Sequence, residues 1–166
     1  MLRRSKGREG HGHRAGVDTA GVVVAGDDPD ALELLGRILA ATGEPVQLIA
    51  DKASAIAAVT TQPRRAFVVT FSGGHSGNLS LVDTIRRHTD AAVRSTPIVM
   101  LADDEKNLTY AWQSGIDAHL VRPVPADVLL ATVNQAMAAT ESERTDHRRT
   151  ELRRAQAAAL ADPDNA

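Results

Sequence analysis

Gly21-Val22-Val23-Val24-Ala25-Gly26 is a short, uninterrupted apolar run, and the fold can be inferred outward from it. Such a β-branched run is typical of a strand that is buried on both faces of a parallel sheet. Asp27-Asp28-Pro29-Asp30 follows directly. Asp before Pro favours the start of a helix, because acidic side chains are stabilised near the positive end of the helix dipole. The segment therefore predicts a buried strand that leads into a helix.

The same alternation continues along the chain. Glycine or proline ends several of the predicted helices, at Gly43, Pro63 and Gly115. Further strands are predicted over 45–50, 66–71, 96–101 and 118–121, and further helices over 52–61, 79–88, 104–113 and 125–139. Five successive strand–helix units predict an α/β fold, a doubly wound parallel sheet in a flavodoxin-like three-layer sandwich with strand order 2-1-3-4-5.

We expect one domain over residues 21–139, between two segments without a core. Residues 1–20 are rich in Gly, Arg and His and have no apolar period, which predicts a disordered basic arm. Residues 140–166 are predicted to be a polar, frayed helical extension with a disordered end. Residues 141–151 contain no apolar side chain and hence no coiled-coil seam. The alternative for this segment is a docking helix for a partner.

Composition limits the classes of function. The chain has no cysteine, which excludes disulfides and Cys-ligated metal sites and fits a reducing compartment. No apolar stretch follows the basic start, and none approaches the roughly 20 residues of a membrane helix. We therefore expect a cytoplasmic protein. The folded part is mildly acidic, which argues against nucleic-acid binding, so only the arm over 1–20 keeps that role open.

The functional site of a doubly wound sheet lies at the carboxyl ends of its strands. The strands predicted here deliver a set of candidate residues to that edge: Gly26, Asp27, Asp28, Thr70, Ala102, His119 and Arg122. No Asp or Glu occurs between Asp51 and Asp83, so the predicted strand over 66–71 carries no carboxylate in any register.

Over about residues 20–139 the sequence resembles the receiver domain of two-component response regulators, the CheY-like fold. The resemblance rests on four segments in order: Val22-Val23-Val24-Ala25-Gly26-Asp27-Asp28-Pro29, Thr96-Pro97-Ile98-Val99-Met100-Leu101, Ser114-Gly115-Ile116-Asp117-Ala118 and Leu120-Val121-Arg122-Pro123. In that family an acidic pair after the first strand holds Mg²⁺, and an Asp ending the third strand accepts a phosphoryl group. A Thr or Ser ending the fourth strand and a Lys before Pro bind that group.

This chain departs from the family's pattern at each of these positions. The acidic pair is Gly26-Asp27, with Asp28 one place later, and the acceptor position holds Thr70. Ala102 occupies the hydroxyl position, Arg122 the Lys position and His119 the place of a frequent aromatic switch residue. The resemblance with these changes implies a degenerate phosphorylation site without bound metal or cofactor, and no enzymatic activity.

Several of these residues admit a plainer interpretation. Asp27 and Asp28 could be helix-capping acids, and Arg122 could pair with Asp27 or face solvent, before a cis proline bond. Thr70 could accept phosphate from a protein kinase or simply end a strand. Gly73-Gly74-x-x-Gly77 could cradle a phosphate or form a flexible connection. Tyr110 and Trp112, possible interface anchors, could equally pack in the core.

We therefore expect a stand-alone pseudo-receiver that signals through phosphorylation-independent protein–protein interaction. Its partner would be a signalling or regulatory protein, such as a histidine kinase or a transcription factor, or a second copy. The face formed by the fourth helix, fifth strand and fifth helix is the usual partner surface in the family. The alternatives are a phosphorelay receiver with a non-standard acceptor and a small-ligand-sensing flavodoxin-like domain.

Overall fold

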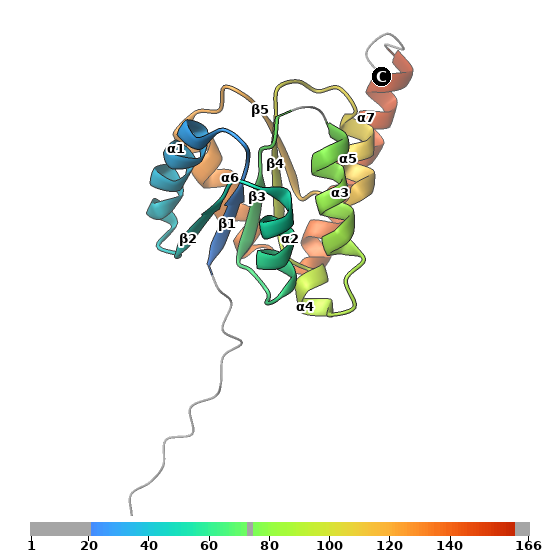
Figure 1. Cartoon of the computed structure of the whole chain (residues 1–166). Helices are drawn as coiled ribbons and strands as arrows, with labels where there is room; N and C mark the ends of the chain where they lie inside the picture. The colour runs from blue at the N-terminus through green and yellow to red at the C-terminus, as the bar shows by residue number, and fades with distance from the viewer. Residues whose placement is uncertain (1–20, 73–74, 162–166) are drawn as a thin grey trace, which may run out of the picture.

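Five parallel strands form a single sheet in the order β2-β1-β3-β4-β5 in this computed structural model, which describes residues 21–72 and 75–161 (Figure 1). The strands are β1 (Val22–Ala25), β2 (Val46–Ile49), β3 (Ala66–Val69), β4 (Ile98–Ala102) and β5 (Ala118–Val121). The predicted doubly wound α/β fold and its strand order are confirmed.

Each of the five strands is followed by a helix, as predicted, but the ends of these helices differ from the predicted ones. The helices are α1 (Pro29–Leu39), the 3-10 helix η1 (Ala40–Thr42), α2 (Lys52–Thr60), α3 (His75–Arg86), α4 (Ala91–Arg94), α5 (Leu108–Ser114), α6 (Ala126–Ala138) and α7 (Glu141–Ala161). α5 begins later than predicted, because Asn107 before it has a left-handed backbone with φ 60°. Gly115 ends α5 with φ 100°, as its sequence position predicted.

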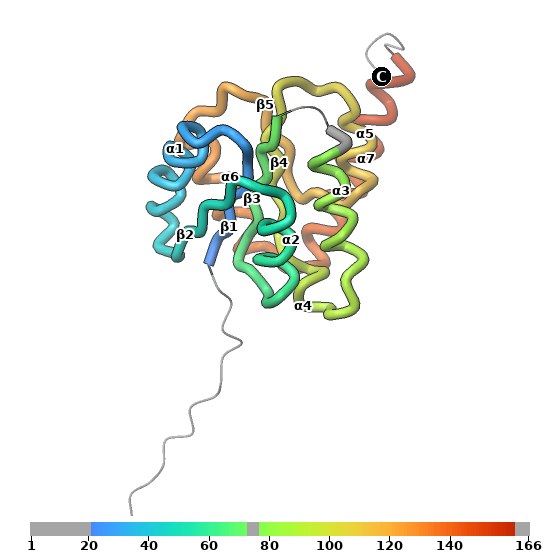
Figure 2. The backbone as a smooth tube through the Cα atoms, in the orientation of Figure 1, coloured from blue at the N-terminus to red at the C-terminus, as the bar shows by residue number. Residues whose placement is uncertain are grey.

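The sheet separates two apolar layers (Figures 1 and 2). α1 and α6 cover one face, and α2, α3 and α5 cover the other. Alternate residues of β1 point to opposite layers: Val22 and Val24 join the α1–α6 side, whereas Val23 and Ala25 join the α2–α3–α5 side. All four residues of β1 are buried, as the uninterrupted apolar run predicted.

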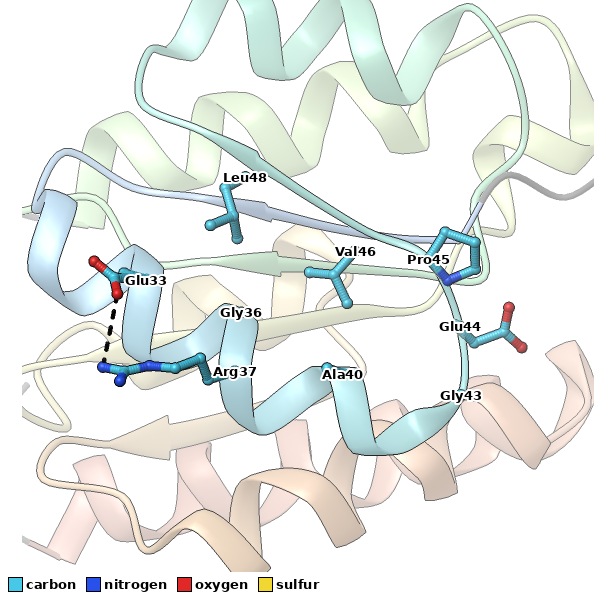
Figure 3. A pocket seen from close by; sticks show the side chains of 9 residues that line it. All are labelled: Glu33, Gly36, Arg37, Ala40, Gly43, Glu44, Pro45, Val46 and Leu48. Carbon is cyan, nitrogen blue, oxygen red and sulfur yellow. Dashed lines mark ion pairs between the residues drawn. The ribbon is translucent and has the colours of Figure 1, made fainter.

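β2 forms one edge of the sheet, and a groove of about 650 Å³ lies between it and α1. Figure 3 shows Val46 and Leu48 pointing from β2 toward α1, with the Glu33–Arg37 ion pair on the same helix. Gly36 permits the close approach, because a Cβ there would lie 3.1 Å from Leu48 Cδ2.

The largest difference from the sequence-based expectation is α7, which is a separate docked helix rather than a frayed extension of α6. Ala139 is extended, with φ −71° and ψ 141°. Thr140 and Glu143 then form a capping box: Thr140 N donates to Glu143 Oε2 (2.7 Å), and Glu143 N donates to Thr140 Oγ1 (3.2 Å). α7 thus turns back and packs along α5, visible at the side of the molecule away from α1 (Figure 1).

The docked face of α7 is a stripe that changes character along the helix. Arg144 and Arg148 reach buried Asp117, just before β5, while Leu152 and Ala155 join the apolar layer that contains α5. These four residues are spaced by three or four, so they lie on one side of the helix. Half of this stripe is arginine, so the sequence of α7 shows no continuous apolar seam.

Among the described residues, no helix combines the length and the apolar character needed to cross a bilayer.

Candidate functional site

Gly26 and Thr70 meet at the carboxyl ends of the adjacent strands β1 and β3. The two strands pair with Ala25 opposite Val69, and Thr70 N donates to Ala25 O at 2.8 Å. A Cβ at residue 26 would lie 2.7 Å from Thr70 Cγ2 and 2.9 Å from Thr70 O. Thr70 therefore occupies the space into which a side chain at residue 26 would extend.

The hydroxyl of Thr70 is enclosed. Thr70 is 2% exposed, and its Oγ1 has no hydrogen-bond partner in the structure. A hydroxyl at this depth cannot enter the active site of a protein kinase without local unfolding, which argues against Thr70 as a kinase target.

Asp27 and Asp28, although adjacent, hold different parts of the backbone. Asp28 caps α1, since its Oδ1 accepts from Asp30 N at 3.0 Å and from Ala31 N at 3.1 Å. Asp27 instead accepts from Ser72 N at 2.8 Å and ties the end of β1 to the loop after β3. The helix-cap interpretation thus fits Asp28 but not Asp27.

Backbone N–H donation from Ser72 holds the pKa of Asp27 below its usual value. Burial opposes this shift, while the Ser72 side chain and the charge of Lys52 add to it. Lys52 Nζ lies 5.4 Å from the centre of the Phe71 ring, beside the same loop. The charge of Asp27 is thus already stabilised by the protein itself.

Asp27→Asn is expected to lower the free energy of unfolding by about 0.5–1 kcal/mol at pH 7, a modest loss because the carboxylate is solvent-screened. The pKa is lower in the folded state, so the carboxylate stabilises the fold above the unfolded value of 3.8. This contribution disappears as the pH falls through the lower folded pKa. Urea unfolding at pH 7 and in acid measures the difference.

The matched control is Asp28→Asn. Asn caps a helix about as well as Asp, so this variant should unfold within about 0.5 kcal/mol of the parent at pH 7. A loss in Asp27→Asn that did not shrink in acid would contradict the assigned role of the Asp27 charge.

Arg122 pairs with Asp103, so of the two alternatives for Arg122 the pair with Asp27 is wrong. Arg122 Nη2 lies 2.8 Å from Asp103 Oδ1, and Arg122 N donates to Ala102 O at 2.8 Å. Asp103 follows β4, which is the neighbour of β5, whereas β1 is three strand spacings away, or about 14 Å. The peptide bond between Arg122 and Pro123 is cis, as the resemblance implied.

Asn78 is a buried site residue that the sequence did not identify. Its Nδ2 donates to Phe71 O at 3.0 Å, and its Oδ1 accepts from Phe71 N at 3.2 Å. The side chain thus fixes the backbone directly after Thr70 from the first turns of α3. Gly73 and Gly74 of the proposed phosphate cradle lie outside the described residues, as does the basic arm over 1–20, and Gly77 belongs to α3.

Ala102 contributes a buried methyl group at the carboxyl end of β4, beside the ends of the neighbouring strands. Within residues 21–72 and 75–161, no three His, Asp or Glu side chains are grouped so as to hold a metal ion. The exposed carboxylates here are already engaged: Asp27 and Asp28 accept backbone hydrogen bonds, and Asp103 pairs with Arg122.

The three remaining candidates, Trp112, Tyr110 and His119, differ in exposure. Trp112 is buried, and its ring meets the His147 ring of α7 edge-on at 5.7 Å between centroids. Tyr110 is 59% exposed on α5. His119 is half-buried on β5 and lines a groove of about 710 Å³ between β5, α6 and α7. α7 therefore covers part of the face expected to bind partners.

No protein-family model matches the sequence, and no curated protein matches it. Solved structures nevertheless share its fold. The receiver domain of a sensor histidine kinase from Pseudomonas aeruginosa, with a magnesium ion in its active-site cleft, has a TM-score of 0.63 and 19% identity, over 73% of this chain and 99% of that chain.

Two further structures agree. The chemotaxis response regulator CheY4 of Vibrio cholerae has a TM-score of 0.62 and 20% identity, over 71% of this chain and 98% of that chain. A CheY-like receiver domain protein from Methanospirillum hungatei has a TM-score of 0.64 and 15% identity, over 81% and 99%. The chain therefore has the fold of response regulator receiver domains.

Proposed function

We propose that this chain is a pseudo-receiver, a signalling domain that acts by binding another protein without accepting a phosphoryl group. The observation that carries the proposal is the contact between Gly26 and Thr70, because a side chain at residue 26 would collide with Thr70 Cγ2 and Thr70 O. The receiver fold supports a role in signalling, and the closed site supports a mode of action other than phosphotransfer.

Phosphotransfer to a receiver requires groups that the residues at this edge do not supply. The reaction needs a carboxylate nucleophile and a hard cation, with several oxygen ligands, to neutralise the developing charge. Thr70 offers a buried, neutral hydroxyl, and Gly26 offers no side chain. Asp27 remains as an acid, but Ser72 N already occupies one of its oxygens.

The cation on the opposite side of the site is also engaged. Arg122 forms its ion pair with Asp103, a contact present without any added phosphoryl group. In the proposed function this pair is a fixed link between the ends of β4 and β5, and Ala102 between them has no hydroxyl to bind an oxyanion. The partner is a signalling or regulatory protein, such as a histidine kinase or a transcription factor.

The experiment is to incubate the full chain with a small phosphoryl donor and Mg²⁺ and to measure its intact mass. A receiver domain that accepts phosphate from the same donor serves as the positive control. The proposal expects the control to gain one phosphoryl group and this chain to gain none. A Mg²⁺-dependent gain of one phosphoryl group by this chain would contradict it.

A further inference from the structure

The break between α6 and α7 occurs where the sequence does not require one. Residues 126–161 contain no glycine and no proline, and alanine surrounds the break at 138–139. Alanine is the strongest helix former. The local sequence is thus compatible with one continuous helix over 126–161, which is the extension that the sequence alone predicted.

Specific contacts hold the break in place. Thr140 and Glu143 exchange the hydrogen bonds of the capping box, and Arg144 Nη1 donates to Ala139 O. In a continuous helix, the N–H groups of residues 140–143 would instead donate to the carbonyls of residues 136–139. The break thus replaces helical hydrogen bonds with these side-chain contacts, and the balance between the two conformations depends on a few side chains.

The docked face of α7 matches the surface beneath it, formed by α5, Ser95 and Asp117, in both charge and shape. Arg148 and Arg144 approach Asp117, Arg144 Nη2 donates to Ser95 O at 2.6 Å, and Ala155 is buried in the same layer as Ala111. A second copy of the chain carries the same helix and the same surface for it to dock on. It is therefore a partner whose complementarity is already present in the monomer.

We propose that two copies of this chain exchange α7. The break at 139–140 straightens in each copy, and each α7 docks on the α5 and Asp117 of the other copy to form a two-fold dimer. In the dimer α7 keeps the contacts by which it docks, now with the other copy. Each straightened break at 139–140, the hinge of the exchange, also gains helical hydrogen bonds. The monomer is favoured by the high effective concentration of its own α7, so exchange rises with protein concentration.

Two variants shift this balance in opposite directions. Thr140→Ala with Glu143→Ala removes the capping box and favours the straight helix. Glu141→Pro preserves the break, because Pro is tolerated at the first position of α7 but would remove a hydrogen bond and clash within a continuous helix. Light scattering after size exclusion, over a range of concentrations of the full chain, measures the dimer.

The capping-box variant should strengthen dimerisation by about tenfold or more, because each dimer straightens two hinges and a helix cap changes an equilibrium constant several-fold. Glu141→Pro should remain monomeric. A capping-box variant that is monomeric at every concentration, or a Glu141→Pro dimer as stable as that of the parent, overturns the proposal.

Trp112 distinguishes exchange from other dimers, because it is the single tryptophan and contacts His147 of α7. One preparation carries Trp112→Phe and Thr150→Cys, with a nitroxide attached to the new cysteine. The label is site-specific because the natural sequence contains no cysteine. It is mixed with unlabelled chain, both with the capping box removed. Exchange places the labelled α7 against the unlabelled copy's tryptophan and quenches its emission.

Dimers without quenching would be side-by-side dimers and would overturn the proposal. A red shift of the Trp112 emission in the dimer would show that α7 is released without docking, and would overturn it as well. This measurement does not depend on the proline variant, so it decides the question even if Glu141→Pro fails to fold.

Discussion

Asp117→Asn is expected to lower the free energy of unfolding by about 3–5 kcal/mol, the cost of leaving buried charges without their partner. The Asp117 side chain is 1% exposed. Its Oδ2 accepts from Arg86 Nη2 and from Ile98 N, both at 2.8 Å, and its Oδ1 contacts Arg148 and lies 3.6 Å from Arg144 Nε. One carboxylate thus links α3, β4 and α7.

The arginines around Asp117 repel one another, and without the negative charge of Asp117 this repulsion is no longer compensated. Burial lowers the pKa of Arg86 to about 10, and the charges of Arg148 and Arg144 act in the same direction, while Asp117 opposes them. Asparagine keeps the shape and part of the hydrogen bonding, so the loss reports mainly the charge. Denaturant unfolding of the full chain measures it.

Asp146→Asn is the matched control, because Asp146 pairs with Arg149 on the exposed side of the same helix. Both side chains are more than 70% exposed, and their closest atoms are 3.5 Å apart. Removal of this surface pair should change stability by less than about 0.5 kcal/mol. Similar losses in the two variants would contradict the structural role assigned to Asp117.

Gly26→Asp is expected to lower the free energy of unfolding by about 2–4 kcal/mol, although it restores the acid that the receiver pattern has at this position. The new Cβ would meet Thr70 Cγ2 at 2.7 Å and Thr70 O at 2.9 Å, so β1 and β3 would have to shift. The carboxylate would also be placed beside the buried hydroxyl of Thr70.

Thr70→Ser distinguishes the contact of the new Cβ with the Thr70 Cγ2 methyl group from its contact with the Thr70 carbonyl oxygen. Serine lacks the Cγ2 methyl group, so Gly26→Asp with Thr70→Ser should recover part of the lost stability, while the contact with the backbone carbonyl remains. Thermal or denaturant unfolding of the three variants provides the comparison. If Gly26→Asp were as stable as the parent, the site would have room for an acid and its closure would be disproved.

The architecture could be predicted from the sequence because its signals are local. The apolar run over 22–25 forms a buried central strand, Asp28 and Pro29 begin α1, and Gly115 ends α5. Each signal depends on a few neighbouring residues and on backbone preferences.

The site and the last helix could be predicted only in part, because their contacts join distant segments. That Thr70 fills the space beside Gly26 follows from the register of β1 and β3. The pairing of Arg122 follows from the strand order, which makes β4 and not β1 its neighbour. The docking of α7 depends on Asp117, a residue far from it in sequence. Two arginines one turn apart were the available signal.

The most direct test of the closed site is a titration of the full chain with beryllofluoride and Mg²⁺, followed by NMR of the backbone amides. Beryllofluoride with Mg²⁺ imitates a phosphoryl group on an acceptor carboxylate. The account predicts no saturable shift changes centred on the amides of Gly26, Thr70 and Ala102. Saturable changes at these three amides that require both beryllofluoride and Mg²⁺ would show a working phosphorylation site and contradict the account.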